Sequence, residues 1–186
     1  VSVGGYHTLV LRKDGTVWAF GCGQDGRLGD GATGDRRVPV KAEVDRVVAI
    51  AAGVKHSVAL RRNGSVCTWG DNLYGALGDG TNTDRHTPVL VAGLDKVVKI
   101  AAGWHHTLAL DVEGGVWTWG CNHFGQLGDG TTLDRNRPVR VMRADGKPLV
   151  ARTIAAGGLH SLAIDNGTTA ASAAWATTTV ARRRRA

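Results

Sequence analysis

A segment of about fifty residues is repeated along this chain of 186 residues, and the repeat constrains the fold more than any other feature. Each copy contains Gly-x-x-His followed by Thr or Ser. The four histidines lie 49, 50 and 54 residues apart, at His7, His56, His106 and His160. A second pattern, Gly-x-Leu-Gly-Asp-Gly, keeps the same step at residues 26–31, 75–80 and 125–130. A fixed period of this length indicates copies of one unit that stack on each other.

Within one copy, the local signals all predict β-strands. Four runs of the third copy have the length and composition of strands, at residues 97–102, 107–110, 116–120 and 138–141. Alternation places Leu108 and Leu110 on one face of the second run, and both tryptophans on one side of the third. The fourth contains Pro138, which is tolerated in an edge strand. Four short strands per unit of this length predict the blade of a β-propeller.

The motifs also identify a family. The order Gly-x-x-His-Thr/Ser, Val-Trp-x-Trp-Gly-x-Asn-x-x-Gly-x-Leu-Gly-Asp-Gly-Thr and Pro-Val, best seen from Val97 to Val141, resembles the regulator-of-chromosome-condensation repeat. The Gly-Asp-Gly-Thr form followed by Asp-Arg is similar to the bacterial branch. This resemblance implies an all-β fold, a β-propeller of the seven-bladed type. Seven such units require far more than 186 residues, so we expect an open arc of about three complete blades and a partial one.

The repeat divides the chain into five segments. We expect blades at 1–46, 47–96 and 97–148, the start of a fourth repeat at 149–167, and an Ala-, Thr- and Arg-rich tail at 168–186. The tail departs from the repeat, and two hypotheses account for it: a disordered basic arm, or a shifted reading frame in a GC-rich gene. The chain lacks an initiator Met and opens inside an apolar run, so we expect it to be a fragment.

Charge, hydropathy and cysteine content limit which partners and which cellular location are expected for this chain. Four of the charges in a net +7 come from Arg182, Arg183, Arg184 and Arg185, so nucleic acid is expected to bind weakly at most, through this run. The sequence has no apolar run long enough to span a membrane. Cys22, Cys67 and Cys121 form no Cys-x-x-Cys pair, which argues against a disulfide framework or a zinc site. We expect reduced thiols buried in strands, which favour a cytoplasmic location.

Several motifs suggest chemistry that their context does not support. Residues 21–26 match Gly-x-Gly-x-x-Gly, yet no helix pattern follows, so we interpret them as a turn. Gly23 alternates with Asn72 and Asn122 at one position, which suggests left-handed backbone there. The four repeated histidines cannot converge on one substrate, and we expect each to form hydrogen bonds inside its blade. We predict that the chain is not an enzyme and holds no cofactor or metal.

The repeated Asp residues are expected to cap turns and to pair with arginine. Asp30, Asp79 and Asp129 stand in the Gly-Asp-Gly turns, and an Asp-Arg pair follows each of them. A calcium loop needs a denser alternation of oxygen ligands than this spacing provides.

Positions at which the copies disagree are the candidates for recognition, because a purely architectural role restrains a residue. Two loops per copy vary in this way and are rich in aromatic residues, as protein-binding surfaces are. The candidate residues are Tyr6, Lys55, Tyr74, Trp104, His105, His123 and Phe124. Neutral drift on exposed loops accounts for the same variation and remains open as an alternative.

The function that these patterns favour is a non-enzymatic scaffold that binds another protein through its blade loops. The resemblance implies two alternatives: guanine-nucleotide exchange on a small GTPase, or inhibition of an enzyme by a bound propeller, as for β-lactamases. A third use that the resemblance implies is light sensing, as in the plant UV-B photoreceptor, which uses Gly-Trp-Arg-His-Thr. Residues 103–107 read Gly-Trp-His-His-Thr and the other copies lack this Trp, which argues against light sensing.

Overall fold

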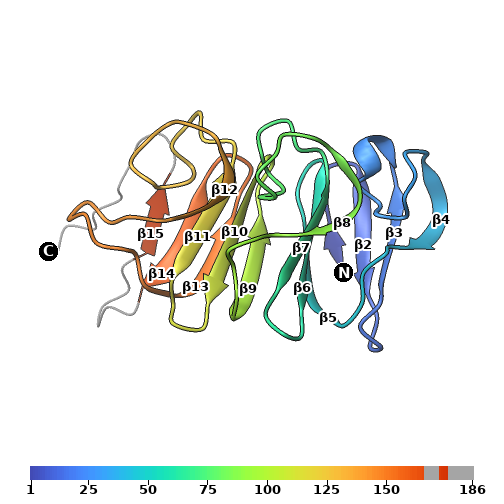
Figure 1. The fold of residues 1–186 in the computed structure, drawn as a ribbon, viewed down its shortest axis with the longest axis horizontal. Coiled ribbons are helices and arrows are strands. Elements are labelled where there is room, and N and C mark those ends of the chain that lie inside the picture. Colours follow the sequence, from blue (N-terminus) through green and yellow to red (C-terminus); the bar gives the residue numbers. More distant parts are fainter. Residues whose placement is uncertain (166–171, 176–186) are drawn as a thin grey trace, which may run out of the picture.

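The computed structural model describes residues 1–165 and 172–175, and it consists of four antiparallel sheets in a row (Figure 1). The first sheet contains β1 (Ser2–Val3), β2 (His7–Leu11), β3 (Val17–Gly21) and β4 (Arg36–Lys41). The second contains β5 (Val47–Ala52), β6 (His56–Arg61), β7 (Val66–Gly70) and β8 (Arg85–Leu90). The third contains β9 (Val97–Ala102), β10 (His106–Asp111), β11 (Val116–Gly120) and β12 (Arg135–Arg140). The fourth contains β13 (Ala151–Ala156), β14 (Ser161–Asp165) and β15 (Ser172–Trp175).

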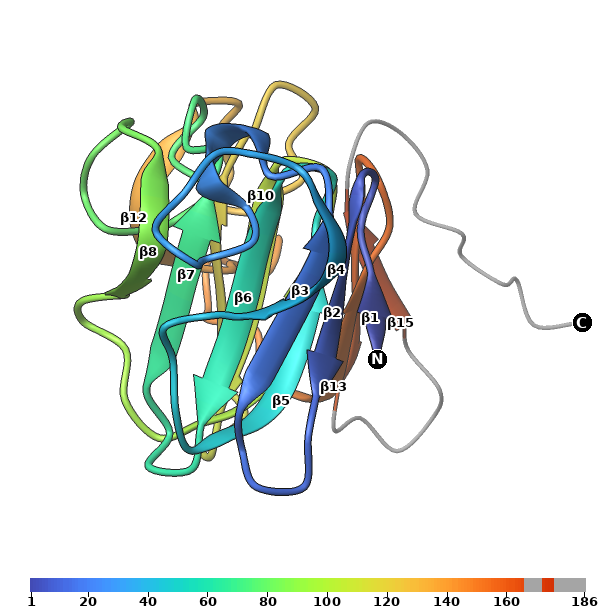
Figure 2. The ribbon, with the colours of Figure 1, turned by 90° about the vertical axis from the view of Figure 1, so that its right-hand side faces the viewer.

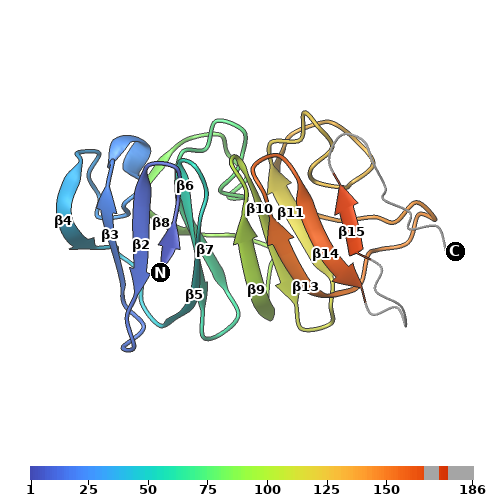
Figure 3. The ribbon, with the colours of Figure 1, turned by 180° about the vertical axis from the view of Figure 1, so that it is seen from behind.

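The strands of each sheet follow one another in chain order, and each pairs with the next in the antiparallel sense. The sheets pack face to face, as the view along the row shows (Figure 2). The first strands β5, β9 and β13 lie side by side and form the inner edge of the row (Figure 3). The outer strands β8 and β12 form the opposite edge of the row, which is nearer the viewer in Figure 1. Within the described residues the row does not close, which confirms the predicted open propeller arc with a partial last blade.

The hydrophobic core lies between neighbouring sheets. The first cluster joins Leu9 and Leu28 of the first blade to Trp69 of the second. The next joins Val58 of the second blade to Trp119 of the third, and the last joins the third sheet to the fourth. Each blade therefore has one apolar face for each neighbour, and a single blade leaves both faces exposed to water.

The repeated histidine links each blade to the next. His7 Nε2 lies 2.8 Å from Ser57 Oγ, and His56 Nε2 lies 3.0 Å from Thr107 Oγ1. His106 makes the same contact with Ser161 at 3.1 Å. The predicted hydrogen-bonding role is confirmed, but these bonds cross between blades, whereas we expected them inside each blade. The sequence could not distinguish the two because donor and acceptor both belong to the repeated motif.

The hydroxyl groups in these contacts also fix the protonated nitrogen of each histidine. Ser57 Oγ donates to the backbone carbonyl of Arg27 at 2.8 Å, and Thr107 Oγ1 donates to that of Ala76 at 2.9 Å. Since each hydroxyl has one proton and has donated it, the hydroxyl accepts from the histidine, whose Nε2 carries the proton. One hydroxyl therefore joins its own blade to two elements of the preceding blade.

Tryptophan and glycine complete the same joint. A Cβ atom at Gly29 would lie 2.7 Å from the indole nitrogen of Trp69 in the next blade, and Gly29 has φ +74°. The Trp69 indole N–H donates to the Arg27 carbonyl at 3.0 Å. Gly78 and Trp119 repeat the close approach in the following pair of blades. The glycine before Asp in the Leu-Gly-Asp-Gly motif is thus required by the tryptophan that covers it.

Strand β15 lies in the segment that the sequence analysis assigned to a tail. It pairs with β14, and Trp175 stands opposite Ser161. Trp69 stands opposite Ser57 and Trp119 opposite Thr107 in the same register. The backbone of residues 172–175 therefore continues the blade pattern, although its sequence lacks the Val-Trp-x-Trp-Gly motif. The remaining tail residues, 168–171 and 176–186, with the four consecutive arginines, lie outside the described residues.

The secondary structure of the described residues is otherwise β, apart from a 3-10 turn, η1 (Gln24–Gly26). This turn ends the Gly-x-Gly-x-x-Gly segment, and the absence of an α-helix after it confirms the turn that we predicted. No helix in this part of the chain has the length and apolar character to cross a bilayer.

The buried histidines make stability depend on pH. Burial lowers the pKa of His56 to about 3 and those of His7 and His106 to about 4, and the positive charge of Arg27 adds to the effect at His7. In the unfolded chain these groups take up a proton near pH 6.5. Below that pH the unfolded state binds more protons than the folded state, so we expect stability to fall from about pH 7 to about pH 5.

Urea unfolding across this pH range measures the effect. The variant His56→Gln is expected to reduce the slope by one proton relative to the unmodified chain. A free energy of unfolding that stays constant between these pH values in the unmodified chain would contradict the proposed role of the histidines.

Candidate functional site

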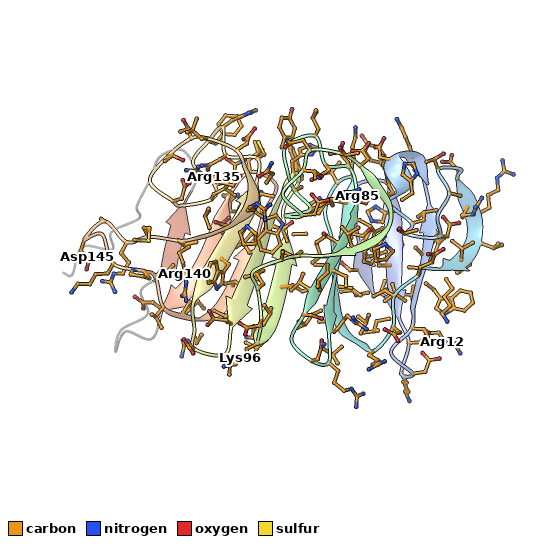
Figure 4. All side chains as sticks on the ribbon, in the orientation of Figure 1. Arg12, Arg85, Lys96, Arg135, Arg140 and Asp145 are labelled. Atoms are coloured by element: carbon orange, nitrogen blue, oxygen red, sulfur yellow. The ribbon has the colours of Figure 1, made fainter. Side chains whose placement is uncertain are left out.

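One face of the row collects the loops in which the copies differ, and we call it the loop face. It carries the Gly-x-x-His turns and the long loops at residues 22–35, 71–84 and 121–134. These long loops lie on the upper side in Figure 1, and the hairpins β2–β3, β6–β7 and β10–β11 lie on the lower side. Figure 4 places Arg85 and Arg135 toward the loop face and Arg12 and Lys96 toward the opposite side.

The Gly-x-x-His turns are joined from blade to blade through their backbones. Gly5 N–H donates to the Gly53 carbonyl at 3.2 Å, and Val54 N–H donates to the Trp104 carbonyl at 3.2 Å. Trp104 N–H in turn donates to the Gly158 carbonyl at 2.9 Å. The histidine ring folds back over the glycine of its own turn, so a Cβ atom at Gly53 would meet the ring of His56. The turns are therefore fixed in place, and their variable side chains project from rigid supports.

A buried asparagine organises each long loop of the second and third blades. The Asn72 amide donates to the carbonyls of Thr81 and Thr83 at 3.0 and 3.1 Å, and its oxygen accepts the N–H of Leu77 at 3.0 Å. Asn122 makes the equivalent bonds. The predicted left-handed backbone is wrong, because neither asparagine has a positive φ and Gly23 has φ −97°. The asparagine is present for its side-chain hydrogen bonds.

The repeated aspartates cap turns and pair with arginine, as predicted. Arg85 Nε donates to Asp79 Oδ2 at 2.7 Å, and Asp84 Oδ1 accepts the Asn72 N–H at 2.8 Å. The first and third blades have the same arrangement. The two repeated carboxylates of each loop therefore have partners that account for their presence in every copy.

Three of the candidate residues meet where the second and third blades adjoin. The ring of Tyr74 meets the ring of His105 edge-on, with centroids 5.4 Å apart and an interplanar angle of 70°. It meets the ring of His123 in the same manner at 5.3 Å and 85°. Because Tyr74 belongs to the second blade and both histidines to the third, the contact spans the joint between them.

Each of the two histidines also has a carboxylate neighbour. His105 Nδ1 lies 3.7 Å from Asp71 Oδ2, and His123 Nε2 lies 3.2 Å from Asp134 Oδ2. Burial acts to raise the pKa of the Asp71 carboxyl, but the neighbouring His105 and the charge of Lys55 lower it below its usual value. Asp71, Tyr74, His105, His123 and Asp134 are called the Tyr74 cluster below.

The other candidate residues lie around this cluster or apart from it. Trp104 is 52% exposed and its indole packs on the backbone of Gly158 in the fourth blade. Phe124, next to His123 in the chain, is 42% exposed. Lys55 is half-buried, with its charge within reach of Asp71. Tyr6 stands apart, on the first blade, where its ring covers the guanidinium of the buried Arg27 at 5.6 Å.

The sequence analysis missed several residues of this surface. Leu73 and Leu133 are each 63% exposed in the long loops. Asp71 occupies the position at which the other copies have Cys22 and Cys121, so comparison of the copies contained the signal that identifies it. Asp134 had no such signal, because aspartate occurs there in every copy.

The cysteines are free among the described residues. Cys67 is buried in β7, as predicted. Cys22 and Cys121 follow directly after β3 and β11, so the predicted location in strands is wrong for these two. Cys121 is buried and Cys22 is half-buried.

A row of four-stranded antiparallel blades that share cores and hydrogen-bonded joints defines a β-propeller arc. The model of the RCC1-like domain matches residues 1–177, so this chain belongs to the RCC1-like domain family. The human protein named Regulator of chromosome condensation is 43% identical over 53 residues, which are 27% of this chain and 13% of the human protein.

Solved structures agree with this assignment. Prp20p of Saccharomyces cerevisiae, described with its binding to Gsp1p and histones, is 27% identical with a TM-score of 0.73, over 93% of this chain and 44% of Prp20p. Yeast RCC1 (Prp20) bound to Kap60 is 26% identical with a TM-score of 0.71, over 93% and 42% of the two chains. Human WBSCR16, at 23% identity and a TM-score of 0.78 over 93% and 45%, shares the fold. The chain spans less than half the length of each of these proteins.

Proposed function

We propose that the chain is a non-enzymatic scaffold and that its loop face binds another protein around the Tyr74 cluster. The observation that carries the proposal is the gathering of Tyr74, His105 and His123 across one blade joint, with exposed apolar side chains beside them. Aromatic residues on rigid supports dominate the energetics of many protein interfaces, because they bury a large area and lose little conformational entropy.

The apolar side chains near the cluster give it the character of an interface centre. Leu73 precedes Tyr74, Phe124 follows His123, and Trp104 precedes His105 in the chain. All three are more than 40% exposed. The carboxylates of Asp71 and Asp134 supply polar groups beside this apolar surface. A partner that buries the aromatic rings and donates hydrogen bonds to these carboxylates fits this surface.

The repeated histidines support a binding role over a catalytic one. His7, His56 and His106 are buried, and the Nε2 of each is engaged with a hydroxyl of the next blade. A general base must reach the proton that it abstracts, and these rings face the joints between blades. Their lowered pKa values follow mainly from burial between the blades.

A set of three substitutions tests the binding face. The variant with Tyr74→Ala, Trp104→Ala and Phe124→Ala is expected to lose the partners that the unmodified chain retains in crosslinking and affinity capture. The matched control substitutes Lys13, Arg62 and Val112 with Ala on the opposite hairpins, and it is expected to retain them. Retention of the same partners by the loop-face variant, with its fold intact by circular dichroism, would refute the assigned face.

A second candidate function is guanine-nucleotide exchange on a small GTPase. It is favoured by the likeness to Prp20p, for which binding to Gsp1p is described, and by the identity with the human regulator of chromosome condensation. In this case the chain is expected to accelerate the release of labelled GDP from Gsp1p. A release rate that does not change with chain concentration, together with partner capture that still depends on the loop face, would leave the scaffold function and reject exchange.

A further inference from the structure

Three side chains of the third blade bring different metal-binding atoms together on the loop face. Cys121 and His123 stand at the start of the long loop and Asp134 at its end. The thiol sulfur, an imidazole nitrogen and a carboxylate oxygen all lie within 4.8 Å of one another. The set combines sulfur, nitrogen and oxygen, which are the donors that zinc takes in proteins.

The separation of two of these atoms already suits a shared ion. His123 Nε2 and Asp134 Oδ2 are 3.2 Å apart. Two ligands at about 2.0–2.1 Å from a tetrahedral ion lie about 3.3 Å from each other, so neither side chain has to move far. The thiolate bond is longer, about 2.3 Å, which places the sulfur about 3.6 Å from the other donors. The sulfur lies within 4.8 Å of the other two donors, so a modest approach closes the site, and the exposed ring of His123 is free to turn toward it.

The surrounding hydrogen bonds hold these donors in place. Asp134 Oδ1 accepts the backbone N–H of Asn122 at 2.7 Å, which leaves Oδ2 directed toward His123. The backbone N–H of Cys121 donates to the His105 carbonyl at 2.8 Å. Fixed donors and oriented carboxylates are the features by which proteins prepare a metal site.

The side chain of Gln126 lies near the Cys121 sulfur. Gln126 is 1% exposed, and its Nε2 has no hydrogen-bond partner among the described residues. A buried amide donor without an acceptor is costly, and a metal-bound thiolate nearby would supply that acceptor.

The other copies show that blade architecture does not require this set. The aspartate occurs in all three copies and accepts the same backbone N–H in each. The other two positions vary, as Cys22 with Gln24 in the first copy and Asp71 with Leu73 in the second. Among the three copies, the third alone combines Cys121 and His123 with the shared aspartate.

We propose that Cys121, His123 and Asp134 form a binding site for a zinc-class divalent cation, with a fourth position open to water or to a donor from a partner. Binding releases the thiol proton to solvent and leaves the sulfur as a thiolate. The sequence analysis excluded zinc because it searched for Cys-x-x-Cys pairs. The site instead joins the two ends of one loop. This inference does not depend on the proposed partner-binding function.

Cobalt titration of the full, metal-free chain tests the site, because a tetrahedral cobalt ion bound to a thiolate has a strong charge-transfer absorption. We expect one ion per chain, displaced by zinc. The absorption is expected to disappear in Cys121→Ser and to persist in the control Cys22→Ser with Cys67→Ser. His123→Leu, which installs the residue of the second copy, and Asp134→Asn, which keeps the acceptor for Asn122, are expected to weaken zinc binding by about tenfold or more.

Two results would overturn the site. One is the absence of the charge-transfer absorption in the unmodified chain at a cobalt excess. The other is zinc binding of equal strength in His123→Leu, whose exposed position keeps the fold intact. Circular dichroism of each variant separates loss of ligation from loss of structure.

Discussion

The hydrogen bond from histidine in one blade to the serine or threonine of the next is the interaction on which this structure depends. At the first two joints it is accompanied by the contact of tryptophan on glycine, and at all three joints the same hydroxyl donates to a loop carbonyl of the preceding blade. Three consecutive blades are linked in this way to their neighbours. Because apolar cores lie between the sheets as well, neither the core nor the polar joint exists in a single blade.

This arrangement separates the residues that build the arc from those that are free to specialise. The Gly, His, Asn, Asp and Trp of the repeat are engaged in joints and loop cores. Positions beside them vary between the copies, and at Tyr74, His105 and His123 they meet across a joint. The rigidity of the turns, which comes from the blade-to-blade backbone bonds at Val54 and Trp104, gives these variable side chains fixed directions. A protein-binding surface and a metal site are both consistent with such positions.

The sequence predicted the blade pattern well because the repeat samples the same physical constraints several times. It placed the histidines in hydrogen bonds but not between blades, since one motif supplies both the donor and the acceptor of each joint. It assigned Asn72 to a backbone role, because the amide contacts with Thr81 and Thr83 depend on a loop closure that spacing does not reveal. The contact of Tyr74 with His123 could not be predicted from the sequence either, since 49 residues and a blade joint separate them.

The central claim is that the repeated features hold blade to blade, and a double-mutant cycle between His56 and Thr107 tests it most directly. The free energies of unfolding of His56→Leu, Thr107→Val and the double variant give the interaction energy of the pair. The account predicts a coupling of about 0.5–3 kcal/mol. A coupling near zero for His56 and Thr107 would contradict the account.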